Sequence, residues 1–171
     1  MAQGTWYHPE SQGGQGKGKW DFSPSTLQAG ARENVQAGQD YSFWMVPQSL
    51  LLLQSGYVAN PPFLTKYLGE ETLIKNNLVV QIHPDTARVI SLREGDRVEV
   101  KSAKGKIKAR IHIFEGARPG CVFVPLGMGH KAYDPTLKDR GDNPYPMLDT
   151  WADPLTGLDV AWATRVKIQK V

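Results

Sequence analysis

The sequence predicts a mainly β domain that closes into a small barrel, with short helices and long loops. Three observations lead to this fold class. Short stretches with strand-like patterns follow one another closely between residues 78 and 125, turns containing glycine separate them, and only one brief helix interrupts them. Closure of the barrel would also pair the edges that such apolar strands otherwise expose.

The clearest strand signal is Lys106–Ile113, where Ile107, Ala109, Ile111 and Ile113 alternate with basic residues and a histidine. A period of two residues is typical of a half-buried antiparallel strand. The other predicted strands are, in chain order, Leu78–Ile82, Arg97–Lys101, Cys121–Pro125 and a closing strand Ala161–Ile168, with Ser49–Gln54 as a strand or an irregular lead-in.

A short helix is predicted at Asp85–Ile90, because Pro84 falls in its first turn, where a missing N–H costs no hydrogen bond. Ala87, Ile90 and nearby Leu92 would face the core. Turns are predicted at Gly95-Asp96, Lys104-Gly105 and Arg118-Pro119-Gly120.

The composition is that of an ordinary globular domain and argues against several functions. The chain has 171 residues, 40% hydrophobic and 22% charged, which is enough for one domain with a core. The net charge of +3 arises from basic residues interspersed with acidic ones, which argues against nucleic acid and suits an anionic partner. The single cysteine, Cys121, rules out a disulfide framework or an iron–sulfur site within the chain, and the four histidines lack metal-ligand spacing.

The chain divides into two regions of different amino-acid composition. Residues 1–40 are polar, with a few scattered aromatic side chains, and cannot build a core. We expect an extended strap that contacts a partner, with a flexible tail as the alternative, and we expect the barrel domain at residues 41–171. Residues 1–18 lack the apolar core of a signal peptide, and the longest apolar run, Ser49–Leu53, is too short to cross a bilayer. We therefore expect a soluble chain with no span of its own.

Two sets of residues resemble a known family. The first set is Ile82–Ala87, Leu92–Val98, Gly105 and Arg118–Gly120, and the second is Pro125–Tyr133, Arg140–Pro144 and Ala161–Ile168. The first resembles the double-psi β-barrel, an aspartate-decarboxylase-like barrel, of the C-terminal molybdopterin-dinucleotide-binding domain of molybdopterin oxidoreductases, the DMSO reductase family. The second is similar to the C-terminus of quinone-linked respiratory members, polysulfide-reductase-like and alternative complex III-like. The likeness covers roughly Ser49 to Ile168.

The resemblance implies a domain that completes a cofactor site and does no chemistry alone. It implies a molybdopterin guanine dinucleotide cofactor with molybdenum or tungsten, shared with a larger catalytic subunit, and an iron–sulfur electron-transfer subunit nearby. The complex would be a membrane-bound respiratory one, with this chain peripheral to it and the side of the membrane left open. No catalytic residue and no metal ligand is assigned to this chain. Because some members keep the fold without the cofactor, a purely structural module is the alternative, and a free-standing adaptor is a third.

The candidate cofactor-binding residues are Asn60, Gly127, Gly129, His130, Arg140 and Asn143. The two glycines could present backbone N–H groups to an anionic or carbonyl oxygen without a Cβ in the way. His130 could donate to a phosphate or a pterin ring, Arg140 offers a planar fork for phosphate, and Asn143 carries both donor and acceptor atoms. Each also has a simpler explanation: a tight turn at the glycines and at the two Asn-Pro pairs, a loop contact for the histidine, and an ion pair for the arginine.

Overall fold

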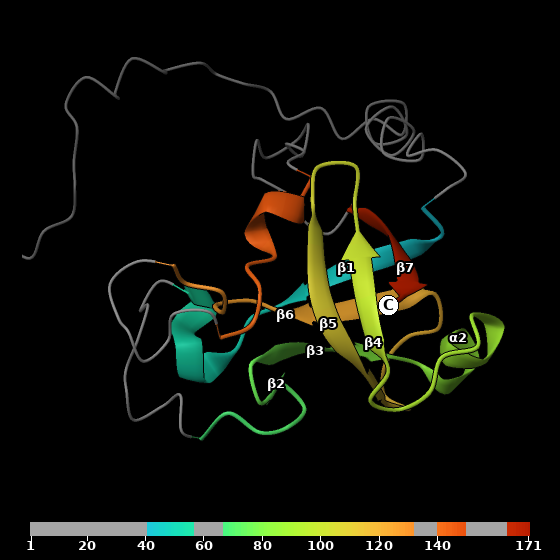
Figure 1. Ribbon diagram of the computed structural model, residues 1–171, viewed down its shortest axis with the longest axis horizontal. Helices are drawn as coiled ribbons and strands as arrows, with labels where there is room; N and C mark the ends of the chain where they lie inside the picture. Colours follow the sequence, from blue (N-terminus) through green and yellow to red (C-terminus); the bar gives the residue numbers. More distant parts are fainter. Residues whose placement is uncertain (1–40, 57–66, 132–139, 150–163) are drawn as a thin grey trace, which may run out of the picture.

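The computed structural model describes residues 41–56, 67–131, 140–149 and 164–171, which form a single seven-stranded sheet with short helical segments (Figure 1). The strands are β1 (Phe43–Gln48), β2 (Leu73–Ile74), β3 (Asn77–Ile82), β4 (Arg97–Lys101), β5 (Lys106–Ile113), β6 (Cys121–Pro125) and β7 (Arg165–Lys170). The helix α2 spans Pro84–Val89, and the two 3-10 helices are η3 (Leu51–Gly56) and η5 (Tyr145–Met147).

The sheet closes on itself into a barrel. Its strand order is β2-β3-β5-β4-β7-β1-β6, and a further pairing of β3 with β6 completes a ring of six strands. Two of the neighbouring pairs, β1–β6 and β3–β5, run parallel, and the other pairs of the ring run antiparallel. The architecture is a double-psi β-barrel, which confirms the predicted fold class, while β2 adds only two residues beside the start of β3.

The core fills the inside of the ring. Ile107, Ala109 and Ile111 of β5 are buried as their alternation predicted, and Ile111 is fully buried. Every other strand of the ring contributes inward residues, namely Met45, Leu78, Val80, Ile82, Val98, Val100, Val122, Val124 and Val166. Because these residues come from all six strands, the core exists only when the ring is closed.

The predicted helix is present as α2, and the residue before it caps it. The Nδ1 atom of His83 accepts a hydrogen bond from Asp85 N–H (3.1 Å), and proline occupies the first turn. Ala87 packs into the core, and Thr86 Oγ1 accepts the N–H of Gly120 (2.9 Å) from the turn before β6. A helix apolar and long enough to cross a membrane does not occur in the described part of the chain.

Two strand boundaries differ from the predictions. Of the two alternatives for Ser49–Gln54, a strand or an irregular lead-in, the strand is wrong: a 3-10 helix begins at Leu51, and the strand lies earlier, at Phe43–Gln48. This strand is apolar on both faces, with Met45 in the core and Trp44 lying under the guanidinium of Arg165 (4.1 Å), so it has no period of two to detect. The closing strand runs from Arg165 to Lys170, and residues 161–163 lie outside the described residues.

Ile111→Ala should lower the free energy of unfolding by about 2–5 kcal/mol, because it leaves a cavity among side chains from several strands. Lys108→Ala, on the same strand but exposed, should change it by less than about 0.5 kcal/mol. Urea unfolding followed by circular dichroism measures both. Equal losses in the two variants would contradict the barrel core described above.

Candidate cofactor-binding site

The site begins with a loop that leaves the end of β6, residues 125–131, here called the glycine loop. β6 is held between β1 and β3, and the N–H of Leu126 donates to the carbonyl of Gln48 (2.9 Å), which extends this anchoring into the loop. Gly127 and Gly129 have φ angles of 96° and 79°, in the left-handed region that side chains disfavour. The backbone conformation at these two positions therefore favours glycine, whether or not a ligand binds.

A second stretch, residues 140–149, packs against the glycine loop and is called here the return segment. The N–H of Gly129 donates to the carbonyl of Arg140 (2.9 Å), and the N–H of Gly141 donates to the carbonyl of Asn76 (3.0 Å). A Cβ added to Gly129 would overlap the backbone nitrogen of Asn143, so the two backbones touch directly. The structure thus brings together five of the predicted site residues, from positions 127 to 143.

His130 closes the glycine loop back on itself. Its Nε2 lies 3.1 Å from the carbonyl oxygen of Gly127. A carbonyl only accepts, so Nε2 carries the proton, and in the neutral ring Nδ1 is left as an acceptor. This loop contact is the simpler role foreseen for a histidine here. A ligand would therefore meet Nδ1 as an acceptor, or as a donor only when the ring is protonated.

Asn143 and Arg140 present polar groups at the surface of the return segment. The Oδ1 atom of the exposed Asn143 accepts the N–H of Tyr145 (3.1 Å), which starts η5 and matches the turn foreseen for an Asn-Pro pair. Arg140 is half-buried, and its guanidinium has no ion-pair partner among the described residues. The side-chain NH2 of Asn143 likewise has no acceptor among them. The remaining candidate, Asn60, lies outside the described residues.

Two positioning residues were missed by the sequence analysis. Asp142 Oδ2 accepts the N–H of Lys108 (2.6 Å), which ties the return segment to β5. Ser102 is buried, and its hydroxyl donates to the carbonyl of Met147 (2.8 Å) and accepts the N–H groups of Lys104 and Gly105 (3.2 Å each). The contacts to Lys108 and Met147 join residues 34 and 45 positions apart, so no local sequence pattern predicts them.

The chemistry of these groups fits an anionic, hydrogen-bonding ligand such as a pterin dinucleotide. Within the described part of the chain, the backbone N–H groups of Met128 and His130 donate to no carbonyl. The backbone of Arg140 lies next to them, since its carbonyl accepts the N–H of Gly129. N–H groups next to left-handed glycines form concavities that favour anions. The described residues contain no cluster of His, Cys, Asp or Glu that could hold a metal. The residues present therefore suit the organic arms of such a cofactor.

Fold and site together define the class of the protein: a double-psi barrel whose glycine loop packs against a return segment that carries an arginine. Residues 65–157 match the family model described as "Molydopterin dinucleotide binding domain". The chain belongs to this family, the C-terminal molybdopterin-dinucleotide-binding domain of molybdopterin oxidoreductases of the DMSO reductase family. The match includes the glycine loop and the return segment, and it leaves out Asn60.

Comparison with curated proteins agrees with this assignment. The chain is 34% identical over 126 residues to the menaquinone reductase, molybdopterin-binding-like subunit, of Nitratidesulfovibrio vulgaris, which covers 74% of this chain and 18% of that protein. It is 36% identical over 101 residues to the arsenate respiratory reductase molybdopterin-containing subunit ArrA of Chrysiogenes arsenatis, covering 54% of this chain and 12% of that protein. The chain thus spans less than a fifth of the length of these relatives.

Among solved structures, acetylene hydratase from Pelobacter acetylenicus superposes with a TM-score of 0.59 at 18% sequence identity. The alignment covers 82% of this chain and 20% of that one. At this identity the likeness concerns the fold alone. It supports the barrel topology derived above from the strand pairings.

Gly129→Ala should destabilise the protein more than Gly95→Ala. Both glycines have φ near +80°, so both variants lose about 1–2 kcal/mol from backbone strain. A Cβ at position 95 meets nothing within 4 Å, whereas at position 129 it overlaps the return segment, which adds about 1–3 kcal/mol. Thermal and urea unfolding measure the difference, and equal losses would mean that the two backbones are not in contact.

Proposed function

We propose that this chain is a non-catalytic unit of a molybdopterin-type oxidoreductase, in which it completes the envelope of a bis-pterin cofactor held by a larger catalytic subunit. The observation that carries the proposal is the packing of the glycine loop against the return segment, which gathers Gly127, Gly129, His130, Arg140 and Asn143 inside the matched family region. The resemblance that the sequence bears to quinone-linked respiratory members, together with the menaquinone reductase relative, supports a membrane-bound respiratory complex with an iron–sulfur electron-transfer subunit.

Each residue has a distinct task in this proposal. The Arg140 guanidinium pairs with a diphosphate oxygen, because a planar fork matches phosphate geometry and the described residues leave it without an ion pair. The N–H groups of Met128 and His130 donate to carbonyl or phosphate oxygens, and the side-chain NH2 of Asn143 donates to a pterin ring edge. The cofactor, a molybdopterin guanine dinucleotide with molybdenum or tungsten, supplies the redox chemistry when bound. The tasks of the protein are to bind, to orient and to exclude water.

The second candidate is a structural module that keeps the fold without a cofactor. It is favoured by the internal bonding of the site, since His130 Nε2 contacts the Gly127 carbonyl and Asn143 Oδ1 accepts the N–H of Tyr145, which commits these two atoms to contacts within the chain. Metal analysis of the complex isolated with this chain separates the two candidates. Molybdenum or tungsten together with pterin fluorescence supports the first, and the absence of both supports the second.

Arg140→Ala and Asn143→Asp should each lower the cofactor content of the complex about tenfold. The first removes a charge-assisted hydrogen bond to phosphate, and the second replaces the NH2 donor to the pterin ring with a carboxylate oxygen. Asn143→Asp keeps the oxygen that caps Tyr145, so the melting temperature of the isolated chain should stay nearly constant. The measurement is pterin fluorescence and metal content per complex at matched loading.

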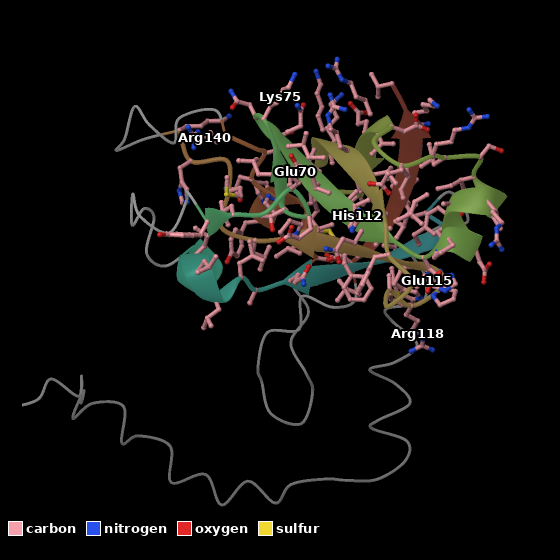
Figure 2. All side chains as sticks on the ribbon, turned by 90° about the horizontal axis from the view of Figure 1, so that it is seen from below. Glu70, Lys75, His112, Glu115, Arg118 and Arg140 are labelled. Carbon is pink, nitrogen blue, oxygen red and sulfur yellow. The ribbon has the colours of Figure 1, made fainter. Side chains whose placement is uncertain are left out.

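Arg118→Ala is the matched control, because this exposed arginine lies on the turn before β6, at the other end of the molecule from Arg140 (Figure 2). The control should retain its cofactor. Full retention in the Arg140 and Asn143 variants would remove both residues from the site. Loss in the control as well would point to a general effect of surface charge.

A further inference from the structure

One side of the barrel carries a strongly basic face formed by the outward side chains of three neighbouring strands, β5, β4 and β7. The basic face consists of Arg97, Lys101, Lys106, Lys108, Arg110 and Lys167, with Glu99 as its single carboxylate. Nitrogen-tipped side chains are seen gathered along this side in Figure 2. These residues sum to a formal charge of +5, more than the +3 of the whole chain, so the remaining residues are together slightly acidic.

Cross-strand pairing on the basic face works against the stability of the fold. Arg97 lies directly opposite Arg110, and Lys101 lies opposite Lys106 on one side and Lys167 on the other. Like charges directly opposite each other in a sheet are destabilising. Two carboxylates offset part of this cost. Glu99 lies opposite Lys108 and its carboxylate is 2.8 Å from Lys106 Nζ, and the Asp142 carboxylate accepts the N–H of Lys108. The three like-charge pairs, Arg97–Arg110, Lys101–Lys106 and Lys101–Lys167, therefore do not contribute to the stability of the fold.

Two of these cations, Arg110 and Lys167, make further contacts within the chain. Arg110 Nη1 donates to the carbonyl of Gly95 (3.2 Å), and the Lys167 ammonium lies over the ring of Tyr41 at 5.6 Å from its centroid. The hydrogen bond from Lys106, with the charges of Lys101 and Lys108, keeps the pKa of the Glu99 carboxyl below its usual range. Arg97, Lys101 and Lys108 are exposed and have no ion-pair partner among the described residues.

We propose that the basic face is a docking surface for an acidic protein surface, one with closely spaced Asp and Glu side chains. Outward residues of a sheet repeat about every 6.6–6.8 Å along a strand and about every 4.8 Å between strands. Cations arranged on such a rigid grid suit carboxylates in an equally rigid arrangement, and electrostatic complementarity of this kind favours both specificity and the association rate. The cost of the like-charge pairs is offset when the partner binds.

An anionic membrane is the less suitable occupant. The outward positions of β4 and β5 carry only charged residues and one histidine, with no apolar side chain to enter the headgroup region. Peripheral membrane binding normally combines basic residues with a buried apolar face.

The test uses the full-length chain and two defined probes, poly-L-glutamate and phosphatidylglycerol vesicles, at low ionic strength. The variant is Arg97→Glu with Lys101→Glu, and the control is Arg93→Glu with Arg118→Glu, an equal charge change at exposed positions outside the basic face. We expect the face variant to bind poly-L-glutamate at least about tenfold more weakly and the control to stay within about twofold of the native chain. We also expect vesicle binding to be weaker than poly-L-glutamate binding.

The same face variant should melt at an unchanged or higher temperature, because each new carboxylate stands opposite a cation. Lys101→Gln serves as a milder replacement if the double variant does not fold. Equal losses in face variant and control, no binding of poly-L-glutamate, or face-dependent binding to vesicles alone would each overturn the proposal. None of these results bears on the cofactor site, since no cofactor is present in the assay.

Discussion

The rest of the structure depends on the pairing of β3 with β6, the contact that closes the ring. It joins Gln81 to Phe123 and Ile82 to Val122, and with the parallel pairing of β1 and β6 it holds β6 on both sides. The core is shared by all six strands of the ring, so opening this pairing would expose it. The glycine loop leaves β6 at Pro125, and its position therefore follows directly from ring closure.

The path of the glycine loop beyond Pro125 is determined by backbone geometry rather than by side-chain contacts. Two glycines with left-handed backbones bend the loop, and the contact of Gly129 with the return segment leaves no room for a Cβ. Asp142 and Ser102 then tie the return segment to β5 and to the β4–β5 turn. Main-chain contacts therefore hold the backbone of Arg140 and Asn143 in place beside the glycine loop.

The distribution of charge distinguishes two surfaces of the barrel. The loop end carries the proposed cofactor contacts, whereas the outer surface of β5, β4 and β7 carries cations in positions that weaken the sheet. The like-charge pairs on these strands lower the stability of the fold, whereas the proposed binding of an acidic partner depends on them. Replacing these cations would stabilise the fold and remove the basic face. On their inner side the same strands contribute apolar residues to the core. Because side chains alternate along a strand, one segment can supply both the core and the basic face.

The sequence by itself determined the elements with strong local signals. The barrel and the family were predicted from the alternation of β5, the proline at the start of α2 and the motif from Pro125 to Pro144. The same motif predicted five residues that the structure brings together. Their role in cofactor binding, like that of Asn60, stays a prediction. The tertiary structure alone decided the strand β1, which is apolar on both faces, the parallel pairings, and the contacts of Asp142 and Ser102. Local periodicity reports which face of a strand is buried. It does not report which distant strand or turn lies beside it, because long-range partners are chosen by closure of the whole ring.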